Sequence, residues 1–159
     1  MKTTINVGDK SLNVVCNAFT PILFKQVFRR DFLIEFGNMT DKASDLVKKA
    51  SVLSGLQKDL DNGKITKEEY LEKYSALNIS NEGIEAVSNR TELVTMLLFI
   101  MNKQSQELDP KKLYQLTELD FFGFLSQFEK NELNNAEVIN HVIAVWKGDS
   151  KALIESKNG

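Results

Sequence analysis

The 159-residue sequence contains one cysteine, one histidine and two prolines, and this scarcity excludes several kinds of site. A lone thiol, Cys16, cannot form an intramolecular disulfide, and a lone His141 cannot build a multi-histidine zinc site. We expect Cys16 to pack as a small apolar side chain and His141 to face solvent. No phosphate-binding glycine loop, nucleophile elbow or zinc-protease motif occurs. The sequence therefore predicts a protein that is not an enzyme and holds no cofactor or metal.

The sequence also has no large excess of acidic or basic residues and no apolar run long enough to cross a membrane. The formal net charge is −2, which does not favour a basic surface for nucleic acid. The longest apolar run, residues 93–101, is interrupted by Thr95 and is much shorter than the ~20 residues that cross a bilayer. Residues 1–10 lack the apolar core of a signal peptide. We expect a soluble, cytosolic protein with no membrane or nucleic-acid partner.

Residues 58–69 match an EF-hand calcium loop only in part. A glycine stands at the sixth position and Glu69 at the twelfth, but Lys58 and Leu60 occupy two positions that should supply oxygen ligands. We favour the alternative, a turn followed by a helix that Thr66 and Glu69 cap. Calcium should then leave the melting temperature unchanged, because a ligand of the folded state would raise it.

Local patterns predict a hairpin followed by helices. Residues 3–7 and 11–15 alternate polar and apolar side chains around a glycine-bearing loop, which is typical of a β-hairpin at about 3–15. The first helix is expected to run from Thr20-Pro21 to about Phe36 and to stop at Gly37-Asn38. Further helices are expected at 41–60, 67–77, 90–106, from Asp109-Pro110, at 118–128, and up to Gly148. The predicted N-caps, each with its first-turn partner, are Thr20 with Pro21, Thr66 with Glu69, Asn89 with Glu92, Thr117 with Asp120, and Asn134 with Glu137.

These elements predict an α+β fold that is mainly α, with an N-terminal β-hairpin packed on a bundle of about five to six helices. We expect a single domain over 1–159, with its helical part at about 21–156. Residues 55–82 are charged and contain glycine, which favours a mobile insertion. The last four residues, 156–159, are expected to form a loose tail.

The first predicted helix carries two apolar stripes. Leu23, Val27 and Ile34 form one stripe, and a second consists of four phenylalanines at i+4 spacing. One interpretation is that the hairpin covers one stripe and the 90–106 helix covers the other. The alternative is that part of the phenylalanine stripe stays exposed and binds a partner. In the 118–128 helix, Phe122 likewise points off the shared apolar face. With ten phenylalanines in the chain, we favour a binding module with these candidate partner-binding residues: Phe24, Phe28, Phe32 and Phe122.

The order of these segments resembles the tail assembly chaperones of long-tailed, siphovirus-type bacteriophages. In that family a short hairpin leads through Thr-Pro into a helix with an Arg/aromatic–Asp signature, here "NAFTPILFKQVFRRDFLIEF". An apolar helix with a polar end and an acidic, aromatic helix follow, here "LVTMLLFIMNKQSQ" and "TELDFFGFLSQFE". The similarity covers about 70 of the 159 residues, and Phe121 or Phe122 stands where the family often has tryptophan. Residues 41–88 have no clear counterpart.

The resemblance implies a non-enzymatic function in tail morphogenesis. Such proteins bind the long tape-measure protein in the host cytoplasm and keep it soluble, and they are absent from the mature virion. A ribosomal frameshift often adds a carboxy-terminal extension, through which a longer product could contact the tail-tube protein. Ser156-Lys157-Asn158 can be encoded by a slippery heptamer, although an ordinary polar end is the alternative. Self-association stays open.

Two other classes compete with this interpretation. A cytosolic adaptor or regulator would use the same aromatic stripes to bind a partner helix. A DNA-binding regulator is less favoured, because Arg29-Arg30 is the only adjacent arginine pair and the chain is slightly acidic.

Overall fold

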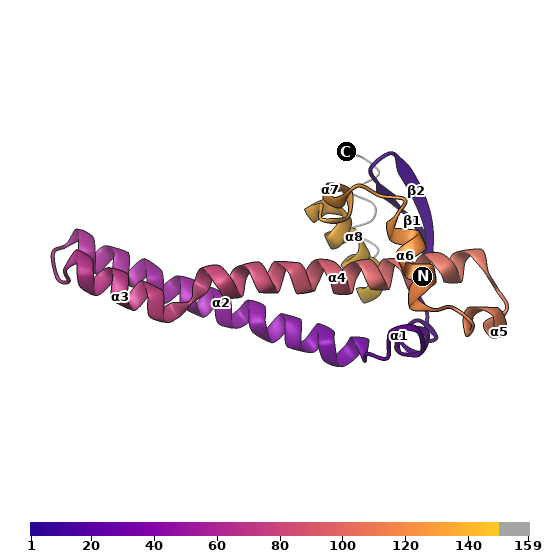
Figure 1. The fold of residues 1–159 in the computed structure, drawn as a ribbon, viewed down its shortest axis with the longest axis horizontal. Helices are drawn as coiled ribbons and strands as arrows, with labels where there is room; N and C mark the ends of the chain where they lie inside the picture. Colours follow the sequence, from indigo (N-terminus) through magenta and orange to yellow (C-terminus); the bar gives the residue numbers. More distant parts are fainter. Residues whose placement is uncertain (150–159) are drawn as a thin grey trace. The chain divides into compact units, whose positions relative to one another are not determined.

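The computed structural model describes residues 1–149. Within them a two-stranded antiparallel hairpin precedes eight helical segments, so the fold is α+β and mainly helical, as the sequence predicts. The elements are, in chain order, β1 (Lys2–Val7), β2 (Lys10–Val15), α1 (Thr20–Phe28), α2 (Phe32–Asp61), α3 (Lys67–Leu77), α4 (Ile79–Gln106), α5 (Pro110–Leu113), α6 (Glu118–Leu125), α7 (Lys130–Leu133) and α8 (Ala136–Lys147) (Figure 1).

The chain forms two compact units. Among the described residues, the core unit comprises Met1–Glu35 and residues 91–149, and the insert unit comprises Phe36–Arg90. Helices α2 and α4 each contribute residues to both units. The single domain over 1–159 and the mobility of residues 55–82 stay predictions. The expected loose tail at 156–159 lies outside the described residues.

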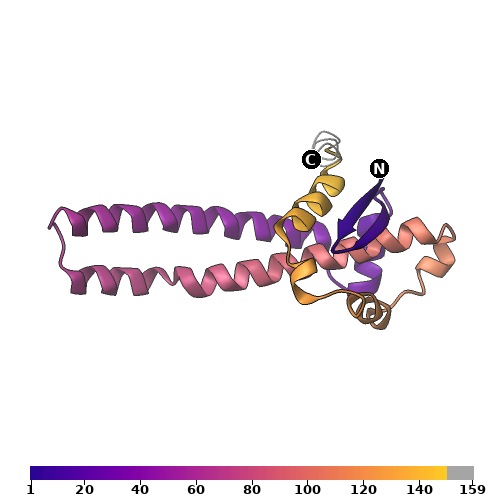
Figure 2. The ribbon, with the colours of Figure 1, turned by 90° about the horizontal axis from the view of Figure 1, so that it is seen from above.

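Helix α4 is the centre of the core unit. Every residue from Leu93 to Asn102 is buried. Figures 1 and 2 show this half of α4 surrounded by the β-hairpin, α1, α6 and α8. A helix that is apolar on all sides is stable in water only when other elements cover all sides.

The β-hairpin places one face of its strands on this core. Ile5, Val7 and Val14 are fully buried because alternate residues of a strand point to the same side. The turn requires a glycine, since Gly8 has a φ of +60° and a Cβ there would collide with the carboxylate of Glu132.

Polar side chains from the end of α4 fix the hairpin and the start of α1. Asn102 Nδ2 donates to the carbonyl oxygen of Asn13 at 2.9 Å. The buried hydroxyl of Thr20 donates to Gln104 Oε1 at 2.7 Å, and Gln104 Nε2 donates to Asn17 Oδ1 at 3.1 Å. These bonds satisfy polar groups that would otherwise be costly to bury.

The prediction of one helix from Thr20 to Phe36 is wrong, because the chain breaks after Phe28. Arg29 adopts the left-handed conformation, with φ at 57°, and its N–H donates to the carbonyl oxygen of Lys25. Asp31 Oδ1 then accepts the backbone N–H groups of Leu33 and Ile34 at 3.1 and 3.3 Å. Asp31 therefore acts as the N-cap of a second helix, α2.

Helix α2 also continues through Gly37-Asn38, where the sequence predicts a stop. A Cβ at Gly37 would meet no atom within 4 Å, so no close packing requires the glycine. A glycine inside a helix costs about 1 kcal/mol relative to alanine. That cost is small beside the hydrogen bonds and packing of a 30-residue helix.

Three predicted N-caps need correction. Thr20 is the first helical residue and Phe19 precedes it as N-cap, while Thr20 makes the buried bond to Gln104 instead. Asn89 lies inside α4, which begins at Ile79. Asn135, one residue after the predicted Asn134, caps α8 by accepting the N–H of Glu137 at 2.8 Å. The caps at Thr66 and Thr117, the helix after Asp109, and the end of the last helix at Gly148 are confirmed.

The insert unit, described by itself, is an antiparallel helical hairpin. Its part of α2 lies beside α3 and the first turns of α4 (Figures 1 and 2). Gly63, with φ at +71°, makes the turn before α3, and Asn78, with φ at 53°, separates α3 from α4. No residue between 36 and 90 is buried.

Candidate binding surfaces

Three of the four candidate partner-binding phenylalanines lie in the core. Phe24, Phe28 and Phe32 are 0%, 5% and 1% exposed. The expectation that part of this stripe stays on the surface is therefore wrong for these rings. After the break at Phe28, Phe32 packs edge-on against both Phe24 and Trp146.

The buried rings belong to one aromatic cluster that extends under α6. Phe28 meets Phe121 at a centroid distance of 5.1 Å and an interplanar angle of 84°. Phe99 of α4 contacts Phe28, Phe121 and Phe124 at 6.1, 5.5 and 5.5 Å. Such tilted and edge-to-face pairs are the favoured aromatic geometry and fix the position of α6 on the core.

Phe122, the fourth candidate, is on the surface as the sequence predicts. Its ring is 57% exposed and contacts only Phe121 among the described aromatic pairs, at 6.1 Å. Leu119, one helical turn earlier, is 77% exposed and lies on the same side of α6. Gly123 follows Phe122, and no atom lies within 4 Å of the place where its Cβ would be. We call Leu119 and Phe122 the α6 apolar surface.

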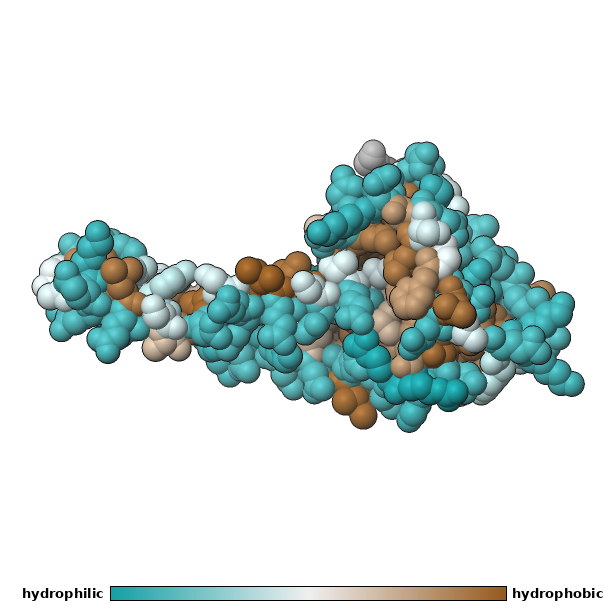
Figure 3. Space-filling model, in the orientation of Figure 1, coloured by the Kyte–Doolittle hydropathy of each residue, from teal (hydrophilic) through white to brown (hydrophobic). Residues whose placement is uncertain are grey.

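Helix α6 presents this surface rigidly. Thr117 and Asp120 form a capping box, in which Asp120 Oδ2 accepts the backbone N–H of Thr117 at 2.8 Å. Phe121 and Phe124 anchor the other side of the helix, at 8% and 3% exposure. Figure 3 shows apolar side chains gathered among polar ones on the α6 side of the core unit. Because the backbone of the helix is already ordered, binding a partner through this surface avoids the entropic cost of ordering a backbone segment.

An arginine holds the junction between α1 and α2. Arg30 pairs with Glu35 through two hydrogen bonds, and its Nη1 donates to Glu92 Oε1 of α4 at 2.7 Å. The hydrogen bond with Glu35 is the main reason why the pKa of Arg30 is raised above its ordinary value. Glu92, expected to cap a helix, is instead the α4 partner of this arginine. Arg30 and Asp31 of the signature thus have structural roles in this fold.

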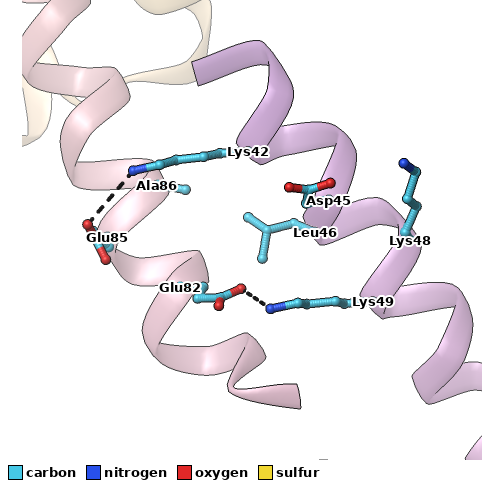
Figure 4. A pocket seen from close by; sticks show the side chains of 8 residues that line it. All are labelled: Lys42, Asp45, Leu46, Lys48, Lys49, Glu82, Glu85 and Ala86. Carbon is cyan, nitrogen blue, oxygen red and sulfur yellow. Dashed lines mark hydrogen bonds and ion pairs between the residues drawn. The ribbon is translucent and has the colours of Figure 1, made fainter. Parts of the chain in front are cut away.

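The insert unit carries a charged groove on one side. The groove has a volume of about 430 Å³ and is lined by charged side chains of α2 and the first turns of α4, together with Leu46 and Ala86. Figure 4 shows Lys42 reaching toward Glu85 and Lys49 toward Glu82 across the two helices. These carboxylates and ammonium groups neutralise one another, so the groove offers no unbalanced charge of one sign to a ligand. Exposed pairs of this kind add little stability.

The residues that could carry chemistry are not brought together. Cys16 is half-buried at the end of the hairpin, and His141 is half-buried rather than solvent-facing, in a polar groove beside β1. Within residues 1–149, no three histidine, cysteine, aspartate or glutamate side chains are placed to hold a metal ion. Among the described helices, none has both the length and the hydropathy needed to cross a membrane.

Comparison with protein-family models, with curated proteins and with solved structures finds no match for this chain. The assignment of function therefore depends on the surface itself. The sequence pointed to Phe122 but not to Leu119, although the i, i+3 spacing of the two residues inside a capped helix was a readable signal.

Proposed function

We propose that this protein is a bacteriophage tail assembly chaperone that binds the tape-measure protein and keeps it soluble during tail morphogenesis. The observation that carries the proposal is the α6 apolar surface, in which Leu119 and Phe122 are 77% and 57% exposed on a capped and anchored helix. Large exposed apolar side chains held in this way are typical of sites for protein partners.

The order of segments that resembles this chaperone family supports the same function. Its acidic, aromatic helix corresponds to α6, where the exposed ring lies. The client, a long helical and hydrophobic protein, would offer apolar side chains that remove Leu119 and Phe122 from water. No catalytic step is part of this proposal, and binding takes place in the host cytoplasm without entry into the mature virion.

Co-expression with the tape-measure protein tests this function. The soluble fraction of the client is measured with the wild-type chain, with the Leu119→Ser/Phe122→Ser double variant, and without the chain. We expect the wild type to raise soluble client several-fold and the double variant to lose most of that gain. Leu108→Ser is the matched control, because Leu108 is 90% exposed but lies outside α6.

Equal client solubility with and without the wild-type chain would refute the chaperone function. Loss of solubilisation by Leu108→Ser as well as by the double variant would refute the assignment to α6. The gene supplies an independent check: a very long helical reading frame should lie immediately downstream. The proposed frameshift at Ser156-Lys157-Asn158, which would extend the chain toward the tail-tube protein, requires slippery codons and an open −1 frame.

A further inference from the structure

The insert unit exposes more aliphatic surface than a two-helix layer can cover. Among its residues, Val47, Ile84 and Val87 are 68%, 70% and 56% exposed. None of residues 36–90 is buried. A helical hairpin normally gains stability by burying an apolar stripe against a further layer, and within this unit no such layer is present.

The residues between the two helices of the insert unit follow a coiled-coil pattern. Half-buried α2 side chains recur at alternating intervals of three and four residues, at Leu46, Lys49, Leu53, Leu56 and Leu60. On α4, Gly83 and Ala86 occupy the facing positions and are also half-buried. These residues define the seam of the hairpin, which is the line along which the two helices pack against each other. Each helix has one flank on either side of this seam.

The charged groove occupies one side of the seam. Asp45 and Lys48 of α2 line it together with Glu82 and Glu85 of α4. Figure 4 shows the two ion pairs that cross between the helices on this side. The charged side chains on this side pair across the helices and are open to solvent, so this side is stable without a protein partner.

The opposite side of the seam carries no charge over its central turns and consists of aliphatic residues and two serines. At 100° per residue around the helix axis, Val47 and Ala50 lie roughly 70–130° from the seam of α2, on the side away from the groove. Ile84 and Val87 lie at similar angles from the seam of α4, also away from the groove. In an antiparallel pair, corresponding flanks of the two helices face the same side. We call this side the insert apolar face, and its members are Ala43, Val47, Ala50, Ser54, Ser80, Ile84 and Val87. None of them lines the charged groove.

We infer that the insert apolar face binds the same face of a second copy of this chain, which forms a four-helix bundle across a two-fold axis. The face is self-complementary in size, because α2 offers small residues around Val47 while α4 offers the larger Ile84 and Val87. In a two-fold pair, the small residues of α2 in one copy accept the larger side chains of α4 in the other.

The available area agrees with a dimer. The α2 segment of this unit, Phe36–Asp61, is about 39 Å long at 1.5 Å per residue, and two helices side by side are about 20 Å wide. One whole side of the insert unit therefore presents on the order of 800 Å², which is what one partner buries in a stable interface of standard size. The insert apolar face fills about half of this side, since its α2 members run from Ala43 to Ser54, and polar residues form the rim, as in other protein interfaces. The absence of charge at its centre allows two copies to meet without burying an unpaired ion.

Sedimentation equilibrium of the full chain tests this inference. The wild type should have the mass of a dimer at micromolar concentrations. Val47→Glu and Ile84→Glu should each raise the dimer dissociation constant at least about 100-fold, because a two-fold interface buries every introduced charge twice. Val52→Glu is the matched control, because Val52 is 52% exposed on the same helix but lies on the groove side, and it should leave the mass unchanged.

Circular dichroism of the same samples shows whether each variant keeps its helices, as substitutions at exposed positions should. A monomeric wild type at these concentrations would overturn the inference, as would dissociation by Val52→Glu to the same extent as by Val47→Glu. If the wild type is monomeric and Val47→Glu abolishes solubilisation of the tape-measure protein, the face binds the client instead of a second copy. Retained solubilisation by a monomeric Val47→Glu variant would separate self-association from the chaperone function and support this inference.

Discussion

Replacing phenylalanine by serine should have very different effects on stability at two positions of α6. Phe124 is 3% exposed and its ring lies 5.5 Å from that of Phe99 and 5.1 Å from that of Phe128. Phe122, two residues earlier, is 57% exposed and meets only the ring of Phe121 among the described aromatic pairs. Phe→Ser at each position changes helix propensity by the same amount, so the difference between the variants reports burial.

The magnitude follows from what each ring contacts. Truncating a buried phenylalanine to alanine costs about 3–5 kcal/mol, and a serine hydroxyl without a partner adds about 1 kcal/mol or more. We therefore expect Phe124→Ser to reduce the free energy of unfolding by about 4–6 kcal/mol. That loss is comparable to the whole stability of a small domain. Phe122→Ser should cost less than about 1 kcal/mol, as exposed substitutions usually do.

Urea unfolding followed by tryptophan fluorescence measures this difference. Trp146 is the only tryptophan, and its ring lies 4.5 Å from that of Phe32, so its emission reports the core unit that contains both α6 residues. Comparable destabilisation by both substitutions would show that Phe122 belongs to the core. The reasoning would then fail, and with it the assignment of Phe122 to a surface that binds a partner.

Three further predictions concern other parts of the chain. Thr20→Val should lower the free energy of unfolding by about 1–3 kcal/mol, because it leaves the buried Gln104 Oε1 without its donor. Thr4 is exposed, so Thr4→Val should have little effect in the same urea assay. Gly55→Ala should stabilise α2 by about 0.5–1 kcal/mol, since its Cβ would meet no atom within 4 Å; a lower melting temperature in circular dichroism would contradict this. The pKa of Glu107 is lowered, mainly because its carboxylate accepts the N–H of Asp109. The ionised carboxylate therefore stabilises the folded state above the ordinary pKa of 4.5, and this stabilisation disappears as the pH falls through the lowered pKa of the folded state. Glu107→Gln should therefore be less stable than the wild type at neutral pH and equal to it in acid.

Features that depend on neighbouring residues could be predicted from the sequence. The capping boxes at Thr66 and Thr117 need only the spacing of a hydroxyl and a carboxylate, and the structure contains both. Gly63 and Gly148 end helical segments with positive φ, as expected for residues without a Cβ. Each of these features depends on atoms within one or two turns of chain.

Features that depend on distant contacts could not be predicted in the same way. Helical periodicity shows that Phe24, Phe28 and Phe32 share a side, but not how many elements cover that side. In the fold, α4 and α6 supply Phe99 and Phe121 to the cluster, and three candidate binding residues become core residues. Leu119 and Phe122 differ from them because nothing in the described core unit covers their side of α6.

The break at Arg29 shows why periodicity alone misplaced a helix end. Apolar residues keep their four-residue spacing across Arg29-Arg30-Asp31, so the hydrophobic pattern contains no sign of an interruption. The signs are polar: Asp31 supplies an N-cap, and Arg30 donates hydrogen bonds to Glu35 and Glu92 at the start of α2. A left-handed arginine costs about 1 kcal/mol or more, whereas charge-assisted hydrogen bonds contribute about 1.5–3 kcal/mol each before the discount for partial exposure. The break is therefore stabilised by a partner from α4, 62 residues further along the chain, and only the folded core brings that partner within reach.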